Sequence, residues 1–269
     1  MMNSGLPTSL EGVEALIGAT RAVGGIMHAI AVVSRAQYAL ADELTQNSLV
    51  YYEWLDEAVA RLAGPPVGNG SPALRILLGP ERALCGNLTR AFEREVDDDP
   101  TLVLVGARLA QSPALAGKAV FATSSVSSGS DIEAKAAEIG EFMIRYGTDL
   151  DVELVFPVNS SGELHRELLL PRRRLDPDSR IDTYSPPQEL LKVLLSQALL
   201  SGRIAHGLAQ ALRAELGARV LVAQRASTHC DERLRALEDE RRVLQKEQVT
   251  SELAEVVAAR ERARVGGEA

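Results

Sequence analysis

The two ends of the sequence contain almost no residues that break helices. No proline follows Pro187, and between Leu10 and Leu62 there is no proline and the strongest breaker is the glycine pair Gly24-Gly25. Proline ends or kinks a helix because it lacks a backbone N–H and clashes with the preceding turn. Its absence therefore predicts one long helix at each end of the chain.

Cysteine is also scarce, and positive charge is not in excess. The two cysteines, Cys85 and Cys230, lie far apart in the sequence, which suits a reducing compartment better than a disulfide framework. The net charge of -8 argues against nucleic acid as the main partner, because counterion release needs a basic face. We therefore expect a cytoplasmic protein.

No long, uninterrupted hydrophobic run is present. The longest stretch of low charge, residues 22–40, is interrupted by His28 and Arg35 and follows no basic segment. Neither a signal peptide nor a membrane span is expected from this pattern. If a membrane matters for this protein, we expect contact with it only through partner proteins.

Motifs for nucleotide binding are missing from the middle of the chain. No G-x-G-x-x-G follows an expected strand, and the pair Gly117-Lys118 is followed by Ala119 rather than by Ser or Thr. Both motifs bind phosphate through glycine-rich backbone, and the second also needs its Lys and hydroxyl. We expect no cofactor, and a sheet in this region would be structural.

Candidates for metal binding and nucleophilic catalysis are weak. His229 and Cys230 are neighbours on an expected helix, so their side chains point about 100° apart and cannot bind one metal ion. Cys85 could be a nucleophile with His165 as its base, but no orienting group accompanies them. The sequence therefore predicts no metal site and no catalytic residue.

The sequence that begins each expected long helix carries capping signals. Thr8 with Glu11 forms one capping box, and Ser185 with Gln188 forms another in which prolines fill the first turn. A helix over residues 186–262 would be roughly 115 Å long, whereas a compact globule of this length has a radius of gyration of about 18 Å. Such a helix must protrude and be covered by another helix or another subunit.

Both expected helices carry a 3.5-residue hydrophobic repeat. Steps of alternating three and four residues from Val13 give fifteen positions, of which eleven are apolar, and such a repeat is typical of a coiled coil. An amphipathic helix on a globular core is the alternative. The first seam is Val13, Leu16, Thr20, Val23, Met27, Ile30, Ser34, Gln37, Ala41, Leu44, Ser48, Tyr51, Leu55, Ala58 and Leu62. The second is Val220, Ala223, Ser227, Cys230, Leu234, Leu237, Arg241 and Leu244, which then slips to Val249, Leu253 and Val256.

Between these helices the pattern changes to short apolar runs that alternate with helical stretches, which predicts an α/β domain. The expected strands are 74–78, 102–105, 118–122, 152–158 and 164–170, and the expected helices are 82–96 and 132–146. The fold class is thus an α/β insert between two long terminal helices that form an antiparallel coiled coil. The expected segments are a helix over 8–64, an α/β domain over 72–184 and a helix over 185–264.

Several short stretches resemble one family over nearly the whole chain. Residues 249–257, V-T-S-E-L-A-E-V-V, are similar to the signature I-T-x-E-L-x-E-I-V, and residues 81–87, E-R-A-L-C-G-N, resemble S-D-R-G-L-C-G-G-x-N with one glycine fewer. Residues 169–171 and 184–186 resemble L-L-P and Y-E-P. Arg219 falls on the arginine of R-M-x-A-M-x-x-A-T-x-N-A. This pattern resembles the gamma subunit of F-type rotary ATP synthases.

The departures from that pattern indicate a divergent member, and an alternative or ion-variant synthase stays open. Near the N-terminus the apolar positions are kept but the family's basic residues and its I-T are lost. Where the family has R-Q, this chain has Gln245 and Lys246, the pair that would touch the catch loop of a catalytic beta subunit. The coupling ion does not follow from the residues.

The resemblance implies a central rotor shaft without bond chemistry of its own. Its helices would stand inside a ring of alpha and beta subunits, and its insert would lie against the epsilon subunit and the c-subunit ring, on the inner face of the cell membrane. The implied rotor–stator contacts are Val13, Ile17, Arg241, Arg242, Gln245, Lys246, Val249, Glu252, Leu253 and Val256. The implied foot or docking contacts are Arg82, Cys85, Gly86, Arg172, Arg173 and Arg174.

Two other readings stay open at this point. The chain could be a non-enzymatic scaffold whose coiled coil joins two copies and whose α/β domain docks a partner. It could also be an enzyme built on the insert, although the insert lacks a motif for one. The basic run at 172–174, followed by acidic residues, is either a solvated loop or a docking surface for an acidic partner.

Overall fold

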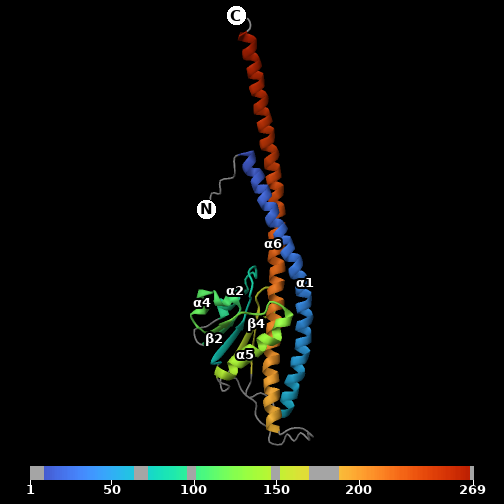
Figure 1. Cartoon of the computed structure of the whole chain (residues 1–269), viewed down its shortest axis with the longest axis vertical. Helices are drawn as coiled ribbons and strands as arrows, with labels where there is room; N and C mark the ends of the chain where they lie inside the picture. The colour runs from blue at the N-terminus through green and yellow to red at the C-terminus, as the bar shows by residue number, and fades with distance from the viewer. Residues whose placement is uncertain (1–8, 64–71, 96–100, 147–151, 170–187, 267–269) are drawn as a thin grey trace. The chain divides into compact units, whose positions relative to one another are not determined.

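The computed structural model describes residues 9–63, 72–95, 101–146, 152–169 and 188–266 (Figure 1). Two long helices, α1 (Leu10–Ala63) and α6 (Gln188–Gly266), flank a set of shorter elements. These are β1 (Leu74–Leu78), α2 (Leu88–Glu95), β2 (Thr101–Val105), α3 (Ala107–Ala110), α4 (Pro113–Ala116), β3 (Ala119–Thr123), η1 (Gly129–Asp131), α5 (Ile132–Tyr146), β4 (Val152–Pro157) and β5 (Leu164–Leu168). The expected fold class, an α/β insert between two long helices, is confirmed.

The chain divides into two compact units that cut across the segments expected from the sequence. Met1–Ile30 and Ala223–Ala269 form the helical unit, and Ala31–Val222 form the sheet unit. Each unit contains a part of α1 and a part of α6. The sheet unit also contains the whole α/β insert.

The insert is a five-stranded sheet in the order β3-β2-β1-β4-β5. Strands β1 to β4 are parallel, and β5 pairs antiparallel with β4. All five residues of β1 are buried, because a parallel strand at the centre of such a sheet is covered on both faces. All five expected strands are confirmed.

Alternate residues of the strands face two separate cores. On one face Leu77 and Leu104 pack with Phe92 of α2 and with α3 and α4. On the other face Ile76 and Leu154 pack with α5 and with a long section of α6. One side of α6 is therefore part of the core of the insert.

The expected helix at 82–96 is wrong at its start. Helix α2 begins only at Leu88, because residues 81–87 form a loop that bonds to other parts of the sheet unit. The expected helix at 132–146 is confirmed as α5. The short helices α3 and α4 were not anticipated, since four residues are too few for a helical repeat to appear.

The buried stripe of α1 agrees with half of the expected seam. Every seventh position from Val13 to Leu55 is buried or half-buried as expected, and so are Ile30 and Ala58, but at all the intervening positions the more buried residue lies one position later than expected. Leu16, Val23 and Tyr51 are thus 38%, 46% and 54% exposed. The buried or half-buried positions that replace the expected ones are Ile17, Gly24, Ala31, Tyr38, Thr45, Tyr52 and Val59.

Small residues explain this difference. An added Cβ at Gly24 would lie 3.2 Å from Cys230 Cβ, so the two helices approach closely at that glycine. A pattern search that looks for large apolar residues selects the neighbouring stripe instead. The expected seam of α6 from Val220 to Leu244 is confirmed, since each of its positions is buried or half-buried.

The helices run antiparallel in each unit. In the helical unit Val13 and Ile17 pack against Leu237. In the sheet unit Leu55 packs against Leu199. The expected neighbour of Leu55, Val220, is wrong by several turns, because heptad spacing alone does not fix which layers meet.

The first turn of α1 is capped, although not by the expected residue. The Gly12 N–H donates to Ser9 Oγ at 3.2 Å, which satisfies a donor that the helix leaves unpaired. Thr8, Ser185 and the prolines after Ser185 lie outside the described residues.

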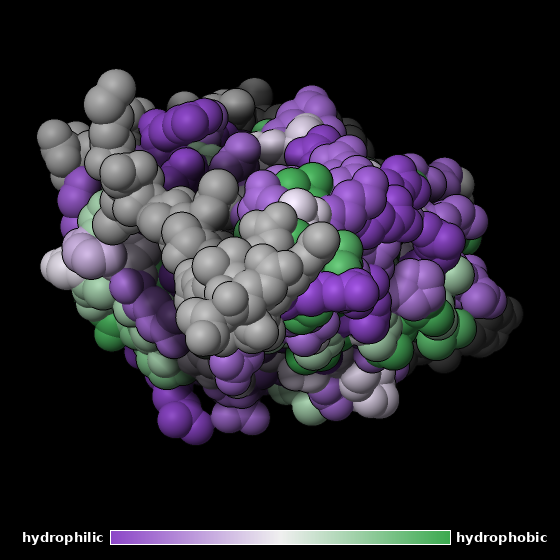
Figure 2. Space-filling view, turned by 90° about the horizontal axis from the view of Figure 1, so that it is seen from above, coloured by the Kyte–Doolittle hydropathy of each residue, from purple (hydrophilic) through white to green (hydrophobic). Residues whose placement is uncertain are grey.

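One 18-residue window within Leu10–Ala60 is apolar enough to cross a membrane by length and composition, which differs from the expectation of no span. Only 17% of the residues in that window are buried. Val32, Val33 and Leu40 are all more than half exposed, so this apolar surface is available to another molecule. Elsewhere, hydrophilic residues dominate the face seen in Figure 2, with smaller hydrophobic groups between them.

Candidate functional site

The end of α6 carries most of the predicted rotor–stator contacts. Every described residue from Gln245 to Val257 is exposed, including Val249, Leu253 and Val256 at 55%, 61% and 65%. The buried stripe of α6 ends at Leu244 because its cluster partner Val13 already belongs to the first turn of α1. In the described part of the chain, no other element covers the aliphatic side chains of this part of α6.

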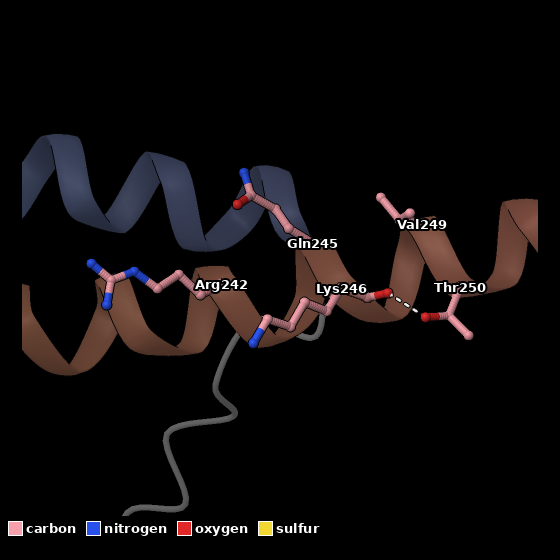
Figure 3. Close-up of a pocket in the computed structure, with 5 residues that line it drawn as sticks. All are labelled: Arg242, Gln245, Lys246, Val249 and Thr250. Carbon is pink, nitrogen blue, oxygen red and sulfur yellow. Dashed lines mark hydrogen bonds between the residues drawn. The ribbon is translucent and has the colours of Figure 1, made fainter.

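A groove of about 530 Å³ lies along this surface, lined by Arg242, Gln245, Lys246, Val249 and Thr250. Figure 3 shows that all five side chains come from α6 and that Gln245 and Val249 point to the same side. That arrangement follows from helical geometry, which places residues i and i+4 on one face.

The polar side chains here have few partners. Arg242 pairs with Asp239 at 3.1 Å, and Thr250 Oγ1 donates to the Lys246 carbonyl at 2.7 Å. In the described part of the chain, neither the Gln245 amide nor the Lys246 ammonium has a hydrogen-bond or ion-pair partner. Both groups are therefore free to meet another molecule.

Three predicted contact residues lie elsewhere on the helix pair. Val13 and Ile17 are 0% and 5% exposed against Leu237, so they hold α1 to α6 within the helical unit. Arg241 is half-buried, and its Nε has no hydrogen-bond partner among the described atoms. Glu252, in contrast, belongs to the exposed end of α6 and accepts a hydrogen bond from Gln248 at 3.0 Å.

The predicted foot residues Arg82, Cys85 and Gly86 lie in the loop between β1 and α2. Gly86 has a φ of 61°, and Leu84 has a φ of 64°, a conformation that costs a residue with a Cβ roughly 1 kcal/mol or more. Arg172, Arg173 and Arg174 lie outside the described residues.

This loop is held to α6 by a buried carboxylate. Glu215, which is 2% exposed, accepts the backbone N–H of Glu81 at 2.7 Å and that of Arg82 at 3.3 Å. Burial raises the pKa of the Glu215 carboxyl, and the hydrogen bonds from the loop oppose that shift. Arg219 Nη1 adds a bond to the Ala83 carbonyl at 2.6 Å.

A second carboxylate joins this loop to the ends of two strands. Glu81 Oε2 accepts the N–H of Ala107, which follows β2, at 3.0 Å, and that of Ser125, which follows β3, at 2.7 Å. Both N–H groups lie just beyond the carboxyl ends of their strands, which is where ligands usually bind in open parallel sheets. Here the Glu81 side chain of the protein itself accepts those N–H donors.

Two arginines of α6 connect α1 to the insert. Arg203 pairs with Asp56 of α1 at 2.9 Å and donates to the carbonyl oxygens of Leu168 and Leu169. Arg213 pairs with Asp42 of α1 at 2.9 Å and donates to the Val158 carbonyl at 2.9 Å. Each guanidinium thus bonds to a helix on one side and to the sheet on the other, and its fork of donors suits this role.

A buried histidine lies between the two bridges. His206 Nδ1 lies 3.1 Å from Ser48 Oγ, and Ser48 donates its single hydroxyl hydrogen to the Thr45 carbonyl at 2.9 Å. A neutral His206 can therefore donate Nδ1–H to Ser48. Burial, followed by the charges of His165 and Arg213, lowers the pKa of His206 to about 4.

The candidate nucleophile and base do not form a catalytic pair. Cys85 is 6% exposed and packs with Leu88 and Ala218, and burial raises the pKa of its thiol. His165 instead lies against the Phe156 ring at 5.2 Å. The described residues contain no group of three His, Cys, Asp or Glu side chains that could hold a metal ion.

Sequence reasoning missed the buried polar residues Arg203, His206 and Glu215 and the half-buried Arg213. A signal was available for Glu215, which follows Leu208 by seven residues and Leu212 by three and so lies on the same helical face as these leucines. A charged residue that recurs within an apolar stripe is costly to bury without a partner. Its presence there predicts a partner from another element.

Comparisons with known proteins agree with this architecture. The ATP synthase family matches residues 9–261. Comparison with curated protein sequences gave no match.

Solved structures of ATP synthases have the same fold. A chain of the Euglena gracilis mitochondrial ATP synthase, in a structure of OSCP, F1 and c-ring, superposes with a TM-score of 0.68 at 13% identity, over 97% of this chain and 96% of that chain. A central stalk and c-ring structure from Tetrahymena thermophila gives 0.58 at 15% identity, over 75% and 99%. A Euglena gracilis rotor structure gives 0.60 at 12% identity, over 89% and 98%.

These identities are low, so the structures show the fold, while the family match over nearly the whole chain decides the membership. The low identity also agrees with the departures seen in the sequence motifs. The chain belongs to the gamma-subunit family of F-type ATP synthases and is a divergent member, a central rotor shaft subunit.

Proposed function

We propose that this chain meets the stator with the end of α6 and the membrane rotor with its α/β insert. The exposed aliphatic residues Val249, Leu253 and Val256 suit a bearing surface inside a ring of alpha and beta subunits, because they present no strong polar anchor in any one orientation. Arg241, Arg242, Gln245, Lys246 and Glu252 supply the polar contacts there. Val13 and Ile17 act indirectly, by holding α1 to α6.

The insert would contact the epsilon subunit and the c-subunit ring. Arg82 and Gly86 lie in a loop whose backbone is fixed by Glu215 and Arg219, and a fixed loop loses little entropy when it docks. Cys85 acts indirectly, by packing this loop against Leu88 and Ala218. Arg172, Arg173 and Arg174 belong to the same proposed surface.

The observation that carries the proposal is the pair of arginine bridges. A rotor transmits torque only if the insert cannot turn relative to the helices that it drives. Arg203 and Arg213 each tie α1, α6 and the sheet together in the sheet unit. The shared core of α6 and the sheet adds apolar packing to these bonds.

Such a subunit acts by differential contact and not by bond chemistry. The shaft would contact each of three catalytic sites with a different face. The nucleotide affinity of a site would then change by the difference in the free energy of that contact between the conformations of the site. We infer that the purified chain has no ATPase activity. We also place it on the cytoplasmic side, at the inner face of the cell membrane, attached only through its partner subunits.

Co-purification from native membranes tests this assignment. A tag on the chain should recover alpha, beta and epsilon subunits with one copy of the chain per complex. Recovery of two copies of the chain without alpha and beta subunits would instead support the scaffold with a dimeric coiled coil.

A disulfide tests the antiparallel pairing within one chain. The Gly24→Cys variant should form an intramolecular disulfide with the native Cys230, because the two Cβ positions lie 3.2 Å apart and a small outward shift brings them into the range of about 3.5–4.5 Å that a disulfide needs. A variant with Leu55→Cys and Val220→Cys is the matched control and should not crosslink. Crosslinks that form only between chains would contradict the pairing.

A further inference from the structure

A cavity of about 450 Å³ opens in the sheet unit where α1, α5 and α6 meet. Leu44, Ser48 and Tyr51 of α1, Glu133 of α5, and Ser201 and Gly202 of α6 are among the residues that line it. None of the predicted contact residues is part of this lining. The cavity therefore needs an explanation of its own.

Small residues create the space. Ala136 of α5 and Ala198 and Ala205 of α6 form part of the lining where larger side chains would fill the gap between the helices. An added Cβ at Gly202 would lie 3.1 Å from Leu55 Cδ1 and 3.6 Å from Tyr51 Cε1. The glycine thus lets the Tyr51 ring lie close along α6 as a wall of the cavity.

The lining combines apolar walls with a few polar groups. Leu44 and Tyr51 keep 37% and 54% of their surface exposed. Ser48 is already engaged by Thr45 and His206. Three other groups that line the cavity, the Asn47 amide, the Ser201 hydroxyl and the Glu133 carboxylate, have no hydrogen-bond or ion-pair partner in the described ranges.

The charge of the lining residues determines which charge a ligand should carry. Glu133 is the only acidic or basic residue among the lining residues, so a cation is attracted and an anion is repelled. The face of an aromatic ring such as Tyr51 also attracts cations. The volume lies within the roughly 300–1,000 Å³ that is usual for small-molecule sites with apolar walls and few polar groups.

We propose that this cavity binds a small amphipathic cation, with its ammonium group at Glu133 and its apolar body between Leu44 and Tyr51. Asn47 and Ser201 supply hydrogen bonds at the mouth. A ligand in this place contacts α1, α5 and α6 at once and so stabilises their arrangement in the sheet unit. This site is independent of the proposed contacts with other subunits.

Titration of the full chain with benzyltrimethylammonium tests the proposal, and 3-phenylpropionate is an anion of similar size for comparison. Trp54 is the only tryptophan and lies one helical turn from Tyr51, so its fluorescence reports occupancy and calorimetry gives the dissociation constant. The cation should bind saturably and at least about tenfold more tightly than the anion. Equal binding of both ions would overturn the proposal.

Variants locate the site. Glu133→Gln should weaken cation binding about tenfold, and Ser201→Phe should abolish it by filling the cavity. Ala137→Phe fills the cavity from α5 and serves if Ser201→Phe fails to fold. Ala134→Phe is the matched control, since Ala134 is an exposed residue of the same helix outside the lining.

Cation binding that survives in Glu133→Gln at full strength, or that survives in both phenylalanine variants of the lining, would also overturn the proposal. Loss of binding in Ala134→Phe would do the same, because it would show that the effect is not specific to the cavity.

Discussion

The sheet unit and the helical unit use the same two helices in different ways. In the sheet unit α6 packs against α1 and also against the sheet, so that nearly every residue from Leu199 to Ala218 is buried or half-buried. In the helical unit only one stripe of each helix is covered, and Val13, Ile17 and Leu237 form its buried cluster. The arrangement in the sheet unit fixes the position of α6 against the sheet, and the arrangement in the helical unit leaves most of the helix surface available to partners.

The polar residues differ in the same way. In the sheet unit Arg203 and Glu215 are buried and bonded to several elements. In the helical unit the ion pair between Arg21 and Glu238 is 66% and 40% exposed, and such pairs contribute about 1 kcal/mol or less. Charges in the sheet unit therefore help to fix the geometry, whereas those in the helical unit mainly keep an exposed helix pair solvated.

The largest expected effect comes from deleting matched core leucines. Leu208 in the sheet unit and Leu237 in the helical unit are 0% and 1% exposed. Leu208→Ala should lower the free energy of unfolding by about 3–5 kcal/mol, and Leu237→Ala by about 2–3 kcal/mol, because a two-helix seam collapses more easily around a cavity. Urea denaturation followed by circular dichroism measures both.

If both variants lost the same free energy of unfolding, the cores of the sheet unit and the helical unit would be equally hard to disturb, and the contrast between the two units would have no energetic basis. Leu237→Asp sharpens the same point, since an unpaired buried carboxylate costs several kcal/mol. We expect that variant to lose assembly with the other subunits while the sheet unit stays folded. Arg173→Asp should affect only docking at the foot.

Removing the arginine bridges should have the next largest effect. Arg203→Ala leaves the Leu169 carbonyl and the Asp56 carboxylate without the donor that joins them, and should cost about 2–3 kcal/mol. Arg21→Ala is the matched control in the helical unit and should cost less than about 1 kcal/mol. Thermal denaturation of the three chains gives the order. A loss in Arg21→Ala as large as in Arg203→Ala would contradict the contrast between buried and exposed charges.

The pH dependence of stability should be smaller and should trace to His206. Its pKa falls from 6.5 in the unfolded chain to about 4 in the folded one, so the unfolded state binds the proton first as the pH is lowered. The contribution of His206 to the free energy of unfolding should be complete above about pH 6.5 and should be lost progressively as the pH is lowered to about 4. The raised pKa values of Glu167 and Glu215 act in the opposite sense.

A substitution separates these contributions. His206→Gln should flatten the decline between pH 6.5 and 4 when melting temperatures are compared across this range. His229→Gln is the control, because the side chain of His229 is 82% exposed in the helical unit. If the acid-induced loss persisted in His206→Gln, the decline would have to come from other groups.

The sequence predicts the long elements of this fold well, because their signals are long. Proline-free ends gave two helices, short apolar runs gave five strands, and the 3.5-residue repeat gave the inner stripe of α6. The inner stripe of α1 was only half predicted, since Gly24, Ala31 and Thr45 pack there through small size and not through hydrophobicity. The register was not predictable, because it depends on which layers meet in three dimensions.

The bonded residues of the candidate site were least predictable. Arg82, Cys85 and Gly86 were found through a family motif, but Glu215 and the two bridging arginines carry no motif. The role of the arginines depends on backbone groups of Val158 and Leu169, and that of Glu215 on backbone groups of Glu81 and Arg82. The sequence does not place these groups beside α6. The end of α6 was the opposite case, since its family motif and the aliphatic residues Val249, Leu253 and Val256 can be read in the sequence itself.

The smallest expected effect concerns that exposed end, where Gln245 and Lys246 stand in place of the family's R-Q. A guanidinium can hold a carboxylate with two parallel hydrogen bonds, whereas an ammonium is a point charge on a flexible stem. At such exposed positions the difference should be about 1 kcal/mol, or roughly a fivefold change in an equilibrium.

Gln245→Arg combined with Lys246→Gln should therefore slow ATP turnover of the reconstituted alpha, beta and gamma complex by up to about fivefold at saturating ATP, by favouring one angular state. Lys246→Ala should change turnover less, and Gln248→Arg, which places a guanidinium nearby but not at the position of the family's arginine, should leave it unchanged. If the restored pair turned over at the rate of the unmodified chain, Gln245 and Lys246 would be part of a plain bearing, and the contrast between the units would rest on packing alone.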